Sequence, residues 1–201
     1  MSTLKNYLNN QLSGIENIIL LDKVEIKKSH YKSIFWVTSF FILSSLPKLG
    51  TGFLPNVYLQ NAVIEGIGPH FWNMIVTGGL ILIGLFFLFP NVRHFPEWAY
   101  RILAGAYTSG MISLGLIIGE LTFAFPDLLP FFETWKIILI LFLLIFSILL
   151  VYGLVYSTFY ISRLLISQEL IELITKMDFR LRFIGFLLFS ISPIIFLLIE
   201  K

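Results

Sequence analysis

The 201-residue sequence contains no cysteine and few charged side chains. Without cysteine the chain has no disulfide, no thiol nucleophile and no thiolate ligand for a metal. Charged residues make up 13 % of the chain, whereas soluble globular domains carry about 25 %, so they are too few to cover a surface that faces water. The formal net charge of +2 is too small for a nucleic-acid-binding footprint, and we expect no direct nucleic-acid partner.

Side chains for catalysis and metal binding are also scarce. The histidines and aspartates of the chain are His30, His70, His94, Asp22, Asp127 and Asp178. These residues form neither the histidine cluster of a zinc enzyme nor the paired aspartates of an intramembrane aspartyl protease. The chain also has no Gly-Lys-Ser/Thr string of the kind that binds phosphate. We therefore expect a protein that is not an enzyme, with no catalytic residue, no cofactor and no metal.

Long apolar runs are what the chain has in abundance. Hydrophobic residues make up 57 % of it, which excludes disorder. Apolar runs cover residues 33–49, 71–89, 102–125, 135–161 and 183–199. A membrane-spanning helix needs about 20 apolar residues; the middle three runs meet this length, and the first and last are marginal. The predicted fold is all-α, a polytopic helical bundle in the lipid bilayer with about five, alternatively four, transmembrane helices.

The basic residues predict the orientation of this bundle. Of the 14 Lys and Arg residues, all but three fall in segment 1–32 and in the second and fourth connections. The three on the other side are Lys48, Lys136 and Lys201. Because basic residues collect on the cytoplasmic side, we expect a multi-pass protein of the bacterial inner membrane with a cytoplasmic N-terminus.

Two segments outside the apolar runs are amphipathic. Residues 1–32 and residues 163–182 each carry an apolar stripe at helical spacing. We predict a cytoplasmic N-terminal segment at 1–32 and a transmembrane bundle at 33–201 with a cytoplasmic helical extension at 163–182. No proline interrupts the chain from 135 to 166, so we expect the fourth helix to continue unbroken into this extension.

Each amphipathic segment either rests on the inner leaflet or docks a soluble cytosolic protein. For 163–182, a further alternative is that its apolar stripe packs against the neighbouring N-terminal helix. For docking, the candidate residues are the charged side chains of the extension: Glu169, Glu172, Lys176, Arg180 and Arg182. If this extension is continuous with the fourth span, a tilt of the span moves the docking face directly.

Small residues on the third run predict close helix packing. Ala106 and Gly110 share one helical face, and Gly115 and Gly119 have the small-xxx-small spacing on the opposite face. We expect a central helix with a neighbour on each side. The spacing alone does not separate contacts within one chain from those of a homo-oligomer, which we also expect.

Glu120 is the one acidic residue well inside a predicted span. An intramembrane carboxylate is costly, so it suggests an ion-linked or sensing role. The alternative is a structural role, with Glu120 reaching the outer interface or pairing with His70 or Lys136.

Two functions fit this sequence. The first is a membrane-embedded sensor or scaffold for a cytosolic effector, which the amphipathic segments favour. The second is a channel-like oligomer or small transporter component, which the small-residue packing and Glu120 favour.

The layout of the whole chain resembles the membrane subunit of Kiwa anti-phage defence systems, the KwaA family. The shared features are the size, the all-helical membrane character, the missing catalytic constellation and a lysine-rich cytoplasmic start, here Lys5, Lys23, Lys27, Lys28 and Lys32. The resemblance implies an inner-membrane homo-oligomer that works with a cytosolic partner, KwaB, in antiviral defence. It transfers no functional residue to this chain.

Overall fold

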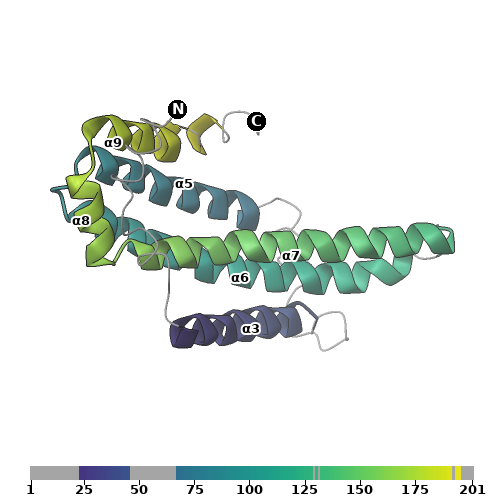
Figure 1. Ribbon diagram of the computed structural model, residues 1–201. Helices are drawn as coiled ribbons and strands as arrows, with labels where there is room; N and C mark the ends of the chain where they lie inside the picture. Colours follow the sequence, from purple (N-terminus) through teal and green to yellow (C-terminus); the bar gives the residue numbers. More distant parts are fainter. Residues whose placement is uncertain (1–22, 46–66, 129, 131, 192, 196–201) are drawn as a thin grey trace. The chain divides into compact units, whose positions relative to one another are not determined.

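The computed structural model describes residues 23–45, 67–128, 130, 132–191 and 193–195 (Figure 1), and these ranges are helical throughout apart from short turns. The helices are α3 (Lys23–Ser45), α5 (Ile67–Leu88), α6 (His94–Leu128), α7 (Thr134–Leu164), α8 (Gln168–Lys176), α9 (Phe179–Phe186) and the π-helix η3 (Leu187–Ile191). The prediction of an all-α fold is confirmed for this part of the chain. Most of the predicted N-terminal segment 1–32 lies outside the described residues.

Three helices are long and apolar enough to cross a membrane. The spans are Phe71–Leu88 in α5, His94–Thr122 in α6 and Thr134–Leu164 in α7. They correspond to the three middle apolar runs, and they make the chain a membrane protein. The first and last runs, 33–49 and 183–199, are described only in part, and within the described residues neither α3 nor α9 qualifies as a span.

The surface of α7 shows what surrounds the protein. No residue in the most apolar stretch of this helix is buried. Large apolar side chains are exposed along it, including Ile138, Phe142, Phe146 and Leu149. A soluble monomer rarely exposes a continuous apolar surface of this extent, whereas lipid chains cover it in a bilayer.

By compactness the chain divides into two units, which we describe separately. The first holds Met1–Ile26, Asn73–Gly105 and Thr158–Lys201. Its core contains Ile83, Ala99, Leu103 and Leu165, with partly buried side chains around them. Two glycines bring α5 and the C-terminal helices together, because Gly84 lies against Ser190 of η3 and Gly185 of α9 lies against the Phe87 ring. Figure 1 shows α9 beside α5.

The second unit holds Lys27–Trp72 and Ala106–Ser157. Within it, α3 and α6 run in the same direction, because Ser33 contacts Tyr107 near one end and Ser44 contacts Gly119 near the other.

In the same unit, α7 runs opposite to α3. Its Tyr152 bonds to His30 of α3, while the later Tyr156 bonds to the earlier Ser29.

The buried side of α3 is polar. From residue 24 to residue 45, the buried side chains are all serines, namely Ser29, Ser33, Ser44 and Ser45. Several large apolar side chains point outward, and Ile34, Phe35 and Ile42 are 59 %, 62 % and 51 % exposed. This is the reverse of a helix that packs in water, where the apolar stripe faces the core.

The prediction of an unbroken fourth helix is wrong. α7 ends at Leu164, and a turn at 165–167 separates it from α8. Ser167 has an extended backbone (φ −66°, ψ 123°). The turn places Leu165 in the core of the first unit and brings the apolar stripe of α8 onto the same core. Burial of these side chains therefore outweighs continuation of the helix, although no proline is present.

α6 is longer than the apolar run that predicted it. The run begins at residue 102, but the helix begins at His94 and has 35 residues, a length of about 52 Å. Pro96 does not prevent this early start, because the first turn of a helix has backbone N–H groups without intrahelical acceptors. The predicted polar connection therefore shortens, and Arg101 lies on the helix.

Candidate functional site: a groove beside α8 and an interhelical hydrogen-bond cluster

A groove lies in the first unit between α8 and the α5–α6 connection. It consists of two hollows of about 340 and 370 Å³ that share Arg93, Ile171 and Glu172. One wall is formed by the connection and the first turn of α6, with Pro90, Asn91, Arg93, Pro96 and Glu97. The other wall is formed by the α7–α8 turn and α8, with Leu165, Ile166, Gln168, Ile171, Glu172, Thr175 and Lys176. We call this feature the α8 groove.

The connection is shaped by a tight turn after α5. The Phe89 carbonyl accepts a hydrogen bond from the Val92 N–H at 3.1 Å. Pro90 and Pro96 are buried, whereas Arg93 and Glu97 are exposed. The two prolines thus anchor the wall, and the two charged side chains remain accessible from the groove.

The opposite wall is held by the amphipathic packing of α8. Ile174 is 1 % exposed, and Leu170 packs against the core of the first unit. The side chains of Glu169, Glu172 and Lys176 are exposed on the other face. The helix is therefore fixed through its apolar side and presents its charged side outward.

The charges of the groove differ in their pairing. Glu172 forms an ion pair with Lys176, one helical turn later, at 3.2 Å. For Arg93 and Glu97, the described part of the chain offers no ion pair. The groove therefore carries one accessible cation and one accessible anion next to a neutralised pair.

The structure brings only two of the five predicted docking residues into this groove. Glu172 and Lys176 line it, while Glu169 is exposed elsewhere on α8, and Arg180 and Arg182 belong to α9. Sequence reasoning missed Arg93 and Glu97, because only folding brings the α5–α6 connection to α8. The signal available in the sequence is the accumulation of basic residues in the α5–α6 connection and in residues 163–182.

A second polar feature joins α3 to α6 in the second unit. The Ser33 Oγ lies 2.6 Å from the Tyr107 hydroxyl, and that hydroxyl donates to the Ser29 carbonyl at 2.8 Å. Ser33 and Tyr107 are 0 % and 5 % exposed. Sequence reasoning did not identify this cluster, because single serines and tyrosines in apolar runs have no distinctive spacing.

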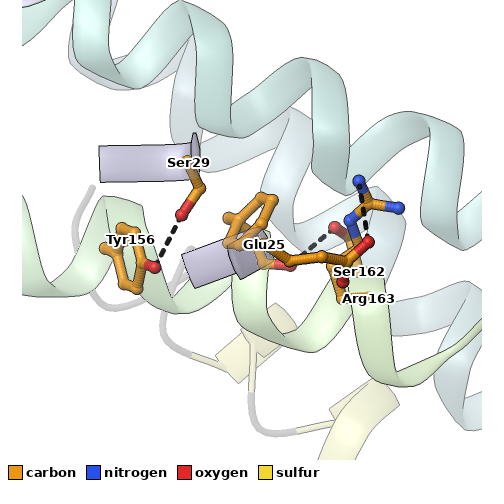
Figure 2. Close-up of polar contacts among 6 residues, drawn as sticks. Glu25, Ser29, Tyr156, Ser162 and Arg163 are labelled. Atoms are coloured by element: carbon orange, nitrogen blue, oxygen red, sulfur yellow. Dashed lines mark hydrogen bonds and ion pairs between the residues drawn. The ribbon is translucent and has the colours of Figure 1, made fainter. Parts of the chain in front are cut away.

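The cluster extends to α7 through a histidine that contacts two tyrosines. The His30 Nδ1 lies 2.8 Å from the Tyr152 hydroxyl, and its ring stacks on Tyr156 with centroids 4.5 Å apart and an interplanar angle of 2°. Figure 2 shows Ser29 bonded to Tyr156, at 2.7 Å. Hydroxyl and imidazole groups from three helices thus satisfy one another.

In the first unit, α3 and α7 are joined by a surface ion pair. The Arg163 Nη2 lies 3.8 Å from the Glu25 Oε1 (Figure 2), and the guanidinium also lies over the Phe159 ring. The Arg163 and Glu25 side chains are 34 % and 44 % exposed, so solvent screens the pair. Its contribution to stability is small.

The predicted packing residues of α6 lie against two sides. Gly115 and Gly119 face α3, where a Cβ on Gly115 would lie 2.5 Å from the Val37 carbonyl oxygen. Gly110 faces Trp72 and Val155. These contacts are within one chain.

Ala106 lies one turn before Gly110 and is completely buried. Its carbonyl accepts a hydrogen bond from the Trp72 indole N–H at 2.8 Å. Small side chains at these two positions therefore allow an indole to reach the backbone of α6.

Glu120 is half-buried on α6, and its Oε1 is shielded from solvent. Lys136, one of its two predicted partners, instead forms an ion pair with Glu133 at 3.3 Å. The side chain of His70, the other partner, lies outside the described residues. A sensing or structural role of Glu120 stays a prediction.

Across the described ranges, no three histidine, aspartate or glutamate side chains gather as metal ligands. The chain matches no protein-family model, no curated protein and no solved structure.

Proposed function

We propose that this protein is a membrane-embedded sensor or scaffold that docks a soluble cytosolic protein on α8. The observation that carries the proposal is the packing of α8. Its buried Ile174 fixes the helix to the core, and its charged face remains free beside a groove. A membrane anchor with such a rigid, polar surface suits the recruitment of a soluble partner.

The proposal includes five spans with a cytoplasmic N-terminus in the bacterial inner membrane. The inverted burial of α3 supports a membrane location for that helix, since its buried side chains are serines and Ile34, Phe35 and Ile42 are exposed. Helix directions support an alternating path, because α3 and α6 are parallel and α7 is antiparallel to α3. In this scheme the α8 groove faces the cytosol.

A role in anti-phage defence is the more specific part of the proposal. It rests on the resemblance in layout to the KwaA family, with a homo-oligomer in the membrane and a KwaB-type protein as the docked effector. Because a turn separates α7 from α8, a movement of α7 reaches the docking face through side-chain packing, chiefly that of Leu165 and Leu170.

One observation favours the alternative of a channel-like oligomer. The interior face of α3 is lined with serines, and such hydroxyl groups also line polar pathways. A conductance measurement on the purified protein in planar bilayers separates the two functions. Ion conductance at low protein density supports the channel, and its absence together with partner binding supports the scaffold.

The docking proposal is tested with the double variant Glu169→Lys, Glu172→Lys. The tagged protein is co-expressed with the soluble proteins encoded beside it, and bound protein is quantified after purification in detergent. We expect a roughly tenfold or greater loss of binding, because reversed charges slow association with a complementary surface.

The control is Glu133→Lys, the same type of substitution at one exposed residue before α7. It should bind as wild type does. If the double variant stays in the membrane, keeps its oligomeric state and retains every soluble protein that wild type retains, α8 is not the docking site.

A further inference from the structure

We infer that the α8 groove binds one segment of the soluble partner, with an acidic side chain on Arg93 and an apolar side chain on Ile171. This inference rests on the proposed function and specifies where and how the partner binds. It moves the main contact from the outer face of α8 to the space between α8 and the α5–α6 connection.

The middle of the groove is apolar. Ile171 is half-buried and belongs to both hollows, and Ile166 at one end is 48 % exposed. Buried Pro96 faces them from the other wall. An apolar side chain from a partner would lose contact with water here, and such central apolar contacts carry much of the binding energy of an interface.

The accessible cation lies next to this apolar centre. Arg93 also lines both hollows, and no carboxylate of the described residues forms an ion pair with it. The nearby Glu172 is already paired with Lys176 at 3.2 Å. A guanidinium binds a carboxylate through two parallel hydrogen bonds, so an acidic side chain of the partner supplies the missing counter-charge.

A polypeptide fits the groove better than an anionic lipid. Recognition of anionic headgroups takes clusters of about four to eight Lys and Arg residues, whereas the residues lining the two hollows include only Arg93 and Lys176, and Lys176 is paired with Glu172. Asn91 and Gln168 add exposed amide groups that can bond to a peptide backbone. Each hollow is at the small end of the range of about 300–1,000 Å³ for ligand pockets, which suits single side chains of one segment.

The experiment uses the photoreactive residue p-benzoylphenylalanine in the full-length protein in living cells. One variant carries it at Ile171 in the groove, and a second carries it at Glu169, outside the groove. After illumination, purification and digestion, mass spectrometry identifies each adduct as a peptide or a phospholipid. We expect a peptide that contains an acidic residue, attached at position 171.

Charge substitutions then test the role of Arg93. Arg93→Glu should lower the yield of the adduct at position 171 by roughly tenfold or more, because the acidic side chain of the partner is repelled. The matched control Arg101→Glu changes an exposed arginine of α6 that does not line the groove and should leave the yield unchanged. Both variants are compared at equal membrane abundance.

The outcomes distinguish this inference from the proposed function. A phospholipid at position 171, or a peptide whose yield is indifferent to Arg93→Glu, overturns the inference. A peptide at position 169 with none at 171 also overturns it, yet leaves docking on α8 intact. The absence of peptide adducts at both positions contradicts the inference and the proposed function together.

Discussion

The Tyr107 hydroxyl of α6 lies 2.6 Å from the Ser33 Oγ of α3, and both groups also lie within 3.0 Å of the Ser29 carbonyl oxygen. These three contacts share only two hydroxyl protons, since serine and tyrosine each have one. With the Tyr107 proton on the Ser29 carbonyl, the Ser33 hydroxyl donates to the Tyr107 oxygen. Such a cluster joins two helices through polar groups while Ile34, Phe35 and Ile42 of α3 face outward.

Removal of the tyrosine hydroxyl should weaken this junction. For Tyr107→Phe we expect a loss of about 0.5–2 kcal/mol in the free energy of unfolding, because the Ser29 carbonyl and the Ser33 hydroxyl lose a buried partner. Unfolding in mixed detergent micelles, followed by intrinsic fluorescence, measures the change. Tyr31→Phe is the control, because Tyr31 is 64 % exposed on the same bundle, and it should be neutral.

A double-mutant cycle isolates the contact between the two side chains. Ser33→Ala and Tyr107→Phe should show a coupling energy of about 0.6–1.7 kcal/mol, between the average and the largest value typical of hydrogen bonds between membrane helices. Strictly additive effects would show that the 2.6 Å contact does not stabilise the protein.

The glycines of α6 should differ in their tolerance to a methyl group. A Cβ on Gly115 would lie 2.5 Å from the Val37 carbonyl oxygen, whereas a Cβ on Gly105 meets no atom within 4 Å. Gly115→Ala should therefore destabilise the fold by about 1–3 kcal/mol. Gly105→Ala, on the same helix, should be neutral or stabilise by up to about 1 kcal/mol. Equal effects in thermal unfolding would argue against close packing of α3 on α6.

Truncation of Ile174 should release α8 from the core. The side chain is 1 % exposed, and Ile→Ala substitutions at such sites cost about 2–5 kcal/mol. We expect Ile174→Ala to accelerate limited proteolysis between residues 165 and 182 in detergent. Thr175→Ala, an exposed neighbour on the same helix, should be cleaved like wild type. An unchanged cleavage rate in Ile174→Ala would show that other contacts hold α8.

Labelling of single cysteines tests the proposed orientation. The chain contains no cysteine, so each introduced thiol gives an unambiguous signal. In intact spheroplasts a membrane-impermeant maleimide should label Glu133→Cys and spare Gln168→Cys, since the two positions lie at opposite ends of α7. Labelling of Gln168→Cys in intact spheroplasts, with Glu133→Cys protected, would invert the scheme and place the α8 groove outside the cytosol.

Apolar length predicted the central helices well but gave no information about their exact ends. The run from residue 135 correctly predicted α7, because 31 residues without a proline favour one helix. The run gave no sign of the turn at 165–167, since that turn forms only where Leu165 and Leu170 find a core to pack against. A break of this kind is a tertiary effect on a sequence that is locally suited to a helix.

The same contrast applies to the two polar features. The charged residues of 163–182 were visible in the sequence, and Glu172 and Lys176 do line the groove. Arg93 lies more than 70 residues earlier in the chain, and its place across from them depends on how α5 and α6 meet α8. Ser33 and Tyr107 likewise become partners only when α3 packs on α6.

The sequence by itself determined that this protein lies in a membrane and that it forms long helices. Apolar composition and run length set the free energy of transfer from water to lipid, and no particular fold changes that quantity. Only the tertiary structure decided which face of each helix is buried. On α3 the fully buried side chains are serines, and Ile34, Phe35 and Ile42 point outward. In lipid, apolar side chains lose nothing by facing out, so hydrogen bonding and the close approach of small residues select the contact faces. Those terms depend on a specific neighbour, which a single stretch of sequence does not reveal.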